Sequence, residues 1–202
     1  MRKPIIALDC DGVLLDYHQA YALAWERAFG VFPAERDPKA YWPWDRWKVE
    51  RLNGAPLSRF RAEFNAQFWT TIPALPDALI ACNMLADAGY TPVCVSAIQH
   101  QFHEARFKNL QDLGFPICNL YATPVTHKGR NPKAPVLNRI QPEAFVDDYA
   151  PYLQGVDVSI YCALIERGLN GSPNVWPDIE RVPLSMHFNL LAFAQWWLRR
   201  TS

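Results

Sequence analysis

Residues 4–16 decide the fold, and they read Pro4-Ile5-Ile6-Ala7-Leu8-Asp9-Cys10-Asp11-Gly12-Val13-Leu14-Leu15-Asp16. The apolar run from Ile5 to Leu8 predicts a short buried strand, and two carboxylates and a glycine follow it directly. Unpaired carboxylates at the end of a core strand are costly to desolvate, so their presence here suggests a bound cation. Gly12 lets the backbone turn where a residue with a side chain would resist. Because ligands of open α/β sheets bind beyond the carboxyl ends of the strands, the pattern predicts a metal-assisted site at the tip of a central strand.

Length and composition indicate one globular domain with room for a modest insertion. The chain has 202 residues, of which 50% are apolar. Its 20 basic and 20 acidic residues cancel, which argues against a nucleic acid polymer or a membrane as partner. The five scattered cysteines fit reduced thiols, and the short apolar run at the N-terminus does not suit a signal peptide. We therefore expect a cytoplasmic protein.

The character of the chain changes twice after the first strand. Residues 17–29 predict a helix, and residues 31–75 combine aromatic side chains with interleaved charges, which indicates two or three short helices. From residue 76 onward helices alternate with strands, as in a parallel sheet with right-handed crossovers. We therefore predict an α/β fold with a doubly wound, Rossmann-like parallel sheet and a small inserted helical cap. The core comprises residues 1–16 and 76–202, and the cap comprises residues 17–75.

Polar residues stand where the predicted strands end or where a helix begins. The later strands are expected at residues 90–95, 117–121, 144–146 and 156–162, with a closing amphipathic helix at 186–200. The polar signals are, in order, Asp9 with Asp11, then Ser96, then Lys133 before a helix, then Asp147 with Asp148. Each alone has a common structural explanation, such as a turn, a helix cap or a surface charge. Their joint order favours one site at the carboxyl edge of the sheet.

The order and local sequence of these signals resemble the haloacid dehalogenase (HAD) superfamily of phosphatases and related hydrolases. Asp9-Cys10-Asp11-Gly12-Val13 resembles the first motif of that superfamily, Ser96 the second, Lys133 the third and Asp147-Asp148 the fourth. The resemblance covers the whole chain and implies a HAD core with a helical cap after the first motif. Phe68-Trp69-Thr70-Thr71-Ile72-Pro73, which leads into a Pro-Asp-Ala helix, is similar to the 5′(3′)-deoxyribonucleotidase branch and hints at a nucleotide substrate.

The resemblance implies a Mg²⁺-dependent phosphatase. Asp9 would be the nucleophile that forms an aspartyl-phosphate, and Mg²⁺ would offset the repulsion between this carboxylate and the phosphate dianion. The metal ligands would be Asp9, the backbone carbonyl of Asp11, and Asp147. Asp148 would orient a bound water or exchange roles with Asp147. Asp11 would serve as general acid and base, and dehalogenase members lack this aspartate, so we rank phosphatase above dehalogenase chemistry.

The resemblance also assigns contacts with the substrate. Lys133 would place a positive charge beside Asp9 and the phosphoryl oxygens, and Ser96 with the backbone N–H of Ala97 would donate hydrogen bonds to the phosphoryl group. Lys128 is a rival for the role of Lys133, whose Lys-Ala-Pro-Val-Leu context fits better. Trp69 and Phe68, near the return from the cap to the core, are the best placed aromatic side chains for contact with a nucleobase.

The sequence leaves open the roles of three other cap tryptophans and two alternative functions. Trp42, Trp44 and Trp47 can stack on a base, although most aromatic residues of a small cap form its core. A phosphate-binding or scaffold protein with the HAD fold and little turnover would carry the same motifs. A receiver-like signalling domain also combines acidic pairs with a Ser or Thr and a Lys, but its phosphorylated aspartate ends a middle strand. We expect a small phosphorylated substrate, no nucleic acid polymer, no membrane, and a Trp-rich surface that offers a homodimer contact.

Overall fold

A six-stranded parallel sheet forms the core of the protein. The computed structural model describes residues 3–125, 131–174 and 183–201. The strands follow the spatial order β3-β2-β1-β4-β5-β6, and every described pair of neighbours is parallel. They are β1 (Ile5–Leu8), β2 (Thr91–Ala97), β3 (Leu120–Thr123), β4 (Ala144–Asp147), β5 (Tyr161–Ile165) and β6 (Ser185–His187). The predicted α/β class with a doubly wound parallel sheet is confirmed.

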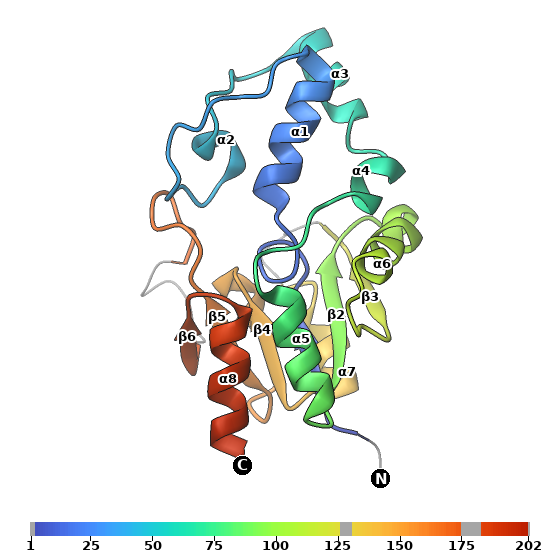
Figure 1. Ribbon diagram of the computed structural model, residues 1–202, viewed down its shortest axis with the longest axis vertical. Coiled ribbons are helices and arrows are strands. Elements are labelled where there is room, and N and C mark those ends of the chain that lie inside the picture. The colour runs from blue at the N-terminus through green and yellow to red at the C-terminus, as the bar shows by residue number, and fades with distance from the viewer. Residues whose placement is uncertain (1–2, 126–130, 175–182, 202) are drawn as a thin grey trace.

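Helices cover both faces of this sheet (Figure 1). One face packs against α5 (Ala78–Asp87), α6 (His103–Asp112) and α8 (Leu190–Thr201), and the short turn η1 (His100–Phe102) precedes α6. The other face packs against α7 (Ala134–Ile140) and the turn η2 (Ala150–Leu153). Because both faces are covered, the central strands are apolar throughout and do not alternate with polar residues.

The strand order determines which polar residues meet. β1 lies in the middle of the sheet, where Leu8 pairs with Cys94 of β2 on one side and with Val146 of β4 on the other. Parallel neighbours in register end at the same edge of the sheet. The residue that follows Leu8 and the residue that follows Val146 therefore lie side by side.

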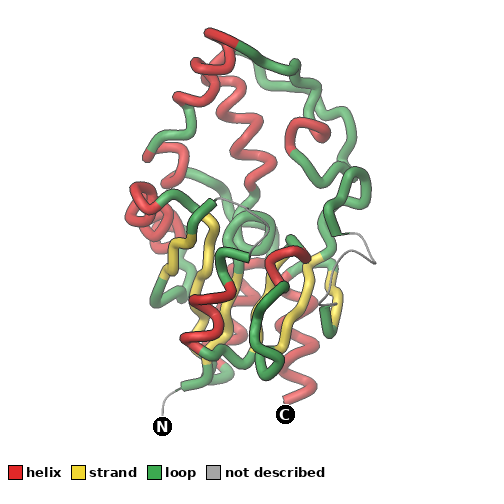
Figure 2. Tube along the Cα trace, turned by 180° about the vertical axis from the view of Figure 1, so that it is seen from behind, coloured by secondary structure: helices red, strands yellow, loops and turns green. Residues whose placement is uncertain are grey.

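The helical cap follows β1 and stands over the carboxyl edge of the sheet (Figures 1 and 2). Its helices are α1 (Tyr17–Phe29), α2 (Pro43–Arg46), α3 (Gly54–Ala62) and α4 (Ala66–Thr70). Rings from α1 and α3 form an aromatic cluster, in which Phe60 lies 5.1 Å from Tyr21 and 5.4 Å from Trp25 between centroids. The short, Trp-rich segment thus obtains its core from aromatic side chains. The boundaries of the cap at residues 17 and 75 stay a prediction.

Two expected elements at the C-terminal end begin later than predicted. The strand expected at 156–162 is β5, which begins only at Tyr161, because Asp157 closes a local turn by accepting hydrogen bonds from the Ser159 N–H and hydroxyl at 2.9 and 2.7 Å. The helix expected from residue 186 begins at Leu190, because residues 185–187 pair with β5 as β6. In the described part of the chain, no helix has the length and apolar character needed to cross a bilayer.

Candidate active site

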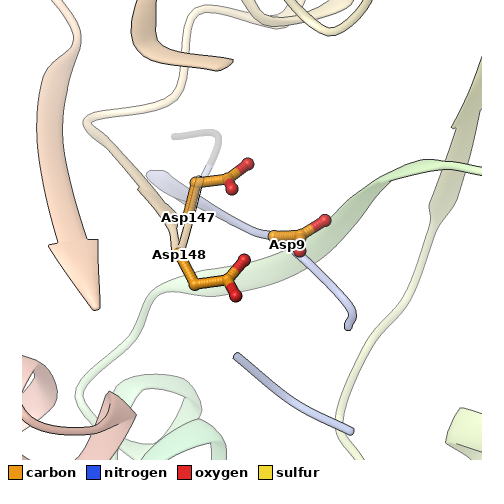
Figure 3. Close-up of side chains that lie close together, drawn as sticks. All are labelled: Asp9, Asp147 and Asp148. Atoms are coloured by element: carbon orange, nitrogen blue, oxygen red, sulfur yellow. The ribbon is translucent and has the colours of Figure 1, made fainter. Parts of the chain in front are cut away.

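Three aspartates from neighbouring strand ends converge at the carboxyl edge of the sheet. Asp9 follows β1, Asp147 ends β4 and Asp148 follows it. One carboxylate oxygen from each lies within 4.8 Å of the others, and Figure 3 shows the three side chains extending to the same side of the strand ends. All three are buried. The sequence predicts these residues at the carboxyl edge of one sheet, and the structure brings them together there, after the adjacent strands β1 and β4.

Burial makes this cluster electrostatically unfavourable by itself. It raises the pKa of all three carboxyls above the usual range, and that of Asp148 to about 7. Lys133 opposes the rise at Asp9 and Asp147, and Arg167 opposes it at Asp148, while the neighbouring carboxylates add to it. Convergent carboxylate oxygens are the donors that Mg²⁺ prefers in proteins. The cluster therefore fits a divalent cation by its donor atoms and by its charge, because three carboxylates face two cationic side chains, Lys133 and Arg167, among the described residues.

Lys133 supplies a buried positive charge that contacts two of these carboxylates. It precedes α7, and its amine donates hydrogen bonds to the Oδ1 atom of Asp9 and, at 2.7 Å, to the Oδ2 atom of Asp147. Burial alone lowers the pKa of this amine, but the charges of Asp147 and Asp9 raise it above the ordinary value. Lys133 is therefore a fixed ammonium that joins β1 to β4. Its rival Lys128 lies outside the described residues.

The Asp11 carboxylate lies apart from the three converging carboxylates. It accepts hydrogen bonds from both terminal nitrogens of Arg106, at 2.8 and 2.9 Å. The next residue, Gly12, has φ +90°, and a Cβ atom there would lie 2.0 Å from a guanidinium nitrogen of Arg167 and 2.3 Å from Oδ2 of Asp148. Glycine is required here both by the backbone angle and by the close approach of these two side chains.

A cavity of about 450 Å³ lies between the cap and the aspartates. On the core side it is lined by Asp9, Asp11, Ser96, Ala97, Asp148 and Arg167. Ser96 is buried within β2 and Ala97 is its last residue, so the strand runs further than expected. On the cap side the lining includes Tyr41, Trp42 and Trp44. The cavity thus has a polar floor and an aromatic roof.

Trp69 departs from the place expected of a base-contacting residue. Its ring stacks on Tyr17 at 6.3 Å between centroids, and the guanidinium carbon of Arg106 lies 4.8 Å from its ring centre. Trp69 is not among the described residues that line the cavity, whereas Trp42 and Trp44 are. Trp47 is buried, and its indole N–H donates to the carbonyl of His18 at 2.9 Å. Local spacing could not reveal which side of each short cap helix faces the core.

Two basic contacts of the site, one from the buried Arg106 and one from the half-buried Arg167, were not predicted. Arg106 holds Asp11 from α6, and Arg167 lies 3.3 Å from Oδ2 of Asp148 and 2.9 Å from Nε2 of His18. Burial, followed by the charge of Arg167, lowers the pKa of His18 to about 4, so this ring is neutral at pH 7. No motif marks these residues, because each reaches its partner across long separations in sequence.

The arrangement of strands separates this fold from a receiver-like domain. In the flavodoxin-like order of receiver domains, the first strand lies between the second and the third. Here β1 lies between β2 and β4. The receiver-like alternative therefore does not fit the sheet.

Comparison with solved structures identifies the fold. The chain matches no protein-family model and no curated protein. It is similar to the D,D-heptose 1,7-bisphosphate phosphatase of B. bronchiseptica, crystallised with magnesium and phosphate, at 16% identity and TM-score 0.52, covering 98% of this chain and 99% of that one. It is also similar to a predicted phosphoglycolate phosphatase from Haemophilus somnus, at 13% identity and TM-score 0.62, covering 100% and 99% of the two chains.

A third match is the L-2-haloacid dehalogenase of Xanthobacter autotrophicus with chloropropionic acid covalently bound, at 12% identity and TM-score 0.62, covering 100% of both chains. These neighbours are HAD superfamily members, and at such identities the likeness shows the fold that the chain shares with them. Phosphatases and dehalogenases both appear among them, so the shared fold does not by itself indicate a reaction.

Proposed function

We propose that this protein is a HAD-type, Mg²⁺-dependent phosphatase that hydrolyses a small phosphate monoester through an aspartyl-phosphate at Asp9. One observation carries the proposal: three buried carboxylates and a buried lysine converge at the sheet edge, beside a cavity of about 450 Å³. The fold shared with a phosphatase crystallised with magnesium and phosphate supports it. Asp11 supports phosphatase rather than dehalogenase chemistry, because only the former uses an acid at the leaving group.

The residues that would hold Mg²⁺ are Asp9, Asp147 and Asp148, with the backbone carbonyl of Asp11 completing the expected set. When bound, the ion neutralises charge so that an anionic carboxylate and a phosphate dianion can approach each other. Lys133 places a second positive charge against the Asp9 carboxylate, and its hydrogen bonds to both strands fix where that carboxylate lies. Because this charge is already in place, it stabilises the charge that develops in the transition state without rearrangement of the site.

In the first half of the reaction, an Asp9 oxygen attacks phosphorus and the bond from phosphorus to the ester oxygen breaks. The electron pair of that bond stays on the leaving oxygen, which takes a proton from Asp11 to become an alcohol. For this step Asp11 has to carry a proton and give up at least one of the two hydrogen bonds that it accepts from Arg106 in this structure. Ser96 and the backbone N–H of Ala97, which line the cavity, donate hydrogen bonds to the phosphoryl oxygens.

In the second half, water attacks the phosphorus of the aspartyl-phosphate. Asp11, now ionised, takes a proton from this water, and the bond between phosphorus and the Asp9 oxygen breaks. Inorganic phosphate leaves, Asp9 is again a carboxylate and Asp11 is again an acid. The same side chain therefore serves as the general acid in the first step and as the general base in the second.

We infer a nucleotide as the substrate class from the roof of the cavity. The rings of Trp42 and Trp44 stack at 4.8 Å between centroids with an interplanar angle of 10°, and Trp44 is 48% exposed. An exposed indole face offers a planar base about 1–3 kcal/mol of stacking. The expected setting is the cytoplasm, with a small phosphorylated substrate as the partner. A scaffold with little turnover is not favoured, because each group that the mechanism needs has a counterpart at this site.

A panel of phosphate esters tests the proposal. Purified full-length protein should release phosphate from p-nitrophenyl phosphate, glycerol phosphate and nucleoside monophosphates in Mg²⁺ and should stop in EDTA. Because the Trp42 and Trp44 rings line the cavity and can stack on a base, we predict a lower KM for the nucleotides than for glycerol phosphate. Absence of metal-dependent release from every ester would overturn the proposal, and tight nucleotide binding without release would favour the scaffold alternative.

A further inference from the structure

We propose that Asn174 is a positioning residue for the metal site: its side-chain amide holds the backbone on both sides of Tyr149 and thereby fixes where Asp148 presents its carboxylate. The inference rests on the proposed function and extends it to a residue outside all four motifs. Asn174 lies 26 positions after Asp148, in the segment that follows β5.

The amide of Asn174 makes two hydrogen bonds to the turn after β4. Its Nδ2 atom donates to the carbonyl of Asp148 at 2.8 Å, and its Oδ1 atom accepts from the N–H of Ala150 at 2.7 Å. Only one orientation of the amide gives both bonds, because the reverse would set oxygen against oxygen and N–H against N–H. The hydroxyl of Tyr41, from the cap, adds a longer contact of 3.4 Å to the same carbonyl.

This turn needs a partner from elsewhere in the chain because the sheet ends before it. Pairing between β4 and β5 extends only as far as Asp147. Asp148 and Ala150 are nonetheless buried, and buried backbone groups without partners are costly. Asn174 bonds the carbonyl before Tyr149 and the N–H after it, as a residue of a neighbouring parallel strand would. One side chain thus continues the hydrogen-bond ladder beyond the end of β4.

The Asp148 carboxylate has little room in which to move. Its Oδ2 atom would lie 2.3 Å from a Cβ atom at Gly12, and a guanidinium nitrogen of Arg167 lies 3.3 Å from the same oxygen. Together with Asp9 and Asp147 it offers oxygens within 4.8 Å of one another. A shift of the backbone at Asp148 would therefore displace one member of this group. Mg²⁺ demands near-ideal geometry from its ligands, so such a displacement weakens its binding.

Asn174 is itself held in place. Its backbone N–H donates to the hydroxyl of Ser172 at 3.2 Å. Earlier in the same segment, the carbonyl of Asn170 accepts from the N–H of Tyr41 at 3.0 Å, and its N–H donates to the carbonyl of Lys39 at 3.1 Å. The segment is therefore fixed to the cap at one point and to the aspartate turn at another.

A positioning role has a signature that a purely structural role lacks. Removing a side chain that orients a metal ligand typically lowers metal affinity by about 10- to 100-fold. Removing a side chain that only stabilises a loop lowers the stability of the protein and leaves the metal affinity of the folded form unchanged. Isothermal titration of the purified full-length protein with Mg²⁺ separates these two cases and requires no turnover.

The test compares Asn174→Ala with wild type. We expect this change to raise the dissociation constant for Mg²⁺ by about 10- to 100-fold. The Mg²⁺ concentration that gives half the maximal rate of phosphate release should rise in parallel. Because all three aspartates remain, saturating Mg²⁺ should recover most of the wild-type kcat.

Asn138→Ala is the matched control, because the side chain of Asn138 also bridges two backbone groups. It donates to the carbonyl of Gly155 at 3.0 Å and accepts from the N–H of Asp157 at 2.8 Å. These groups precede β5, at the edge of the sheet opposite the aspartates. Asn138→Ala should therefore leave the dissociation constant for Mg²⁺ unchanged, even where it lowers the urea concentration at the midpoint of unfolding.

If Asn174→Ala does not fold, Asn174→Ser takes its place, because its shorter side chain cannot bridge both backbone groups, and we expect the same direction of change. An unchanged dissociation constant in a folded Asn174 variant, or an equal increase in Asn138→Ala, would overturn the positioning role. Absence of Mg²⁺ binding by the wild type would overturn both this role and the proposed function. Mg²⁺ binding by the wild type without release of phosphate would overturn the proposed function alone.

Discussion

Asp9→Asn is expected to lower kcat for phosphate release by about 10⁴- to 10⁶-fold, the range seen when a nucleophile is removed from a catalytic unit. The amide keeps the size of the side chain but is a far weaker nucleophile than the carboxylate. Asp9 follows β1, contacts the amine of Lys133 and lines the cavity. Asp147 also contacts this amine but is not among the described residues that line the cavity. The measurement is steady-state phosphate release with saturating Mg²⁺ and ester.

Two controls separate loss of chemistry from loss of fold. Lys133 keeps its hydrogen bond to Asp147 in this variant, so we expect the same urea-unfolding slope and a free energy of unfolding close to that of wild type. Rapid acid quenching during turnover should leave phosphate covalently bound to wild type and not to the variant. Retention of more than a tenth of the wild-type rate by a folded Asp9→Asn protein would contradict the nucleophile assignment.

Lys133→Met is expected to reduce both stability and rate. Without metal, the free energy of unfolding should fall by about 3–5 kcal/mol, because the change removes one partner of a buried ion pair and leaves Asp9 and Asp147 uncompensated. Saturating Mg²⁺ should recover part of this loss by binding only the folded state. The value of kcat should fall by about 10²- to 10³-fold, as when an electrostatic donor of an active site is removed.

Urea unfolding with and without Mg²⁺ measures the change. Lys108→Met is the comparison, because Lys108 is 64% exposed and forms its ion pair with Asp112 on the surface at 2.8 Å. Its effect on the free energy of unfolding should stay below about 1 kcal/mol. Equal stability losses for the two lysines would contradict the assignment of Lys133 as the buried counterion of the aspartates.

The part of the site that could be predicted from the sequence is the part that depends on strand ends. Asp9 and Asp147 follow apolar runs that local composition identifies as strands, and the rules for parallel sheets then place them at one edge. Lys133 could be located because it opens a helix with proline in the first turn, as observed in α7. These inferences need only local sequence and topology.

The unpredicted parts depend on long-range contacts. Arg106 and Asp11 are 95 positions apart, and nothing in the helix around Arg106 distinguishes it from a surface residue. β6 has three residues and forms by pairing with β5, which local propensity does not reveal. For the same reason Trp69 and Trp44 could not be assigned to their surroundings, since each lies in a helix of four or five residues with no clear amphipathic face.

The central claim is that a divalent cation allows the Asp9 carboxylate to approach a phosphoryl group. The most direct measurement is a crystal structure with Mg²⁺ and beryllofluoride, a mimic of a phosphorylated aspartate. We predict beryllium bonded to an Asp9 oxygen, with Mg²⁺ held by Asp9 and at least one of Asp147 and Asp148. Beryllofluoride on another residue, or Mg²⁺ bound away from these three carboxylates, would contradict the account.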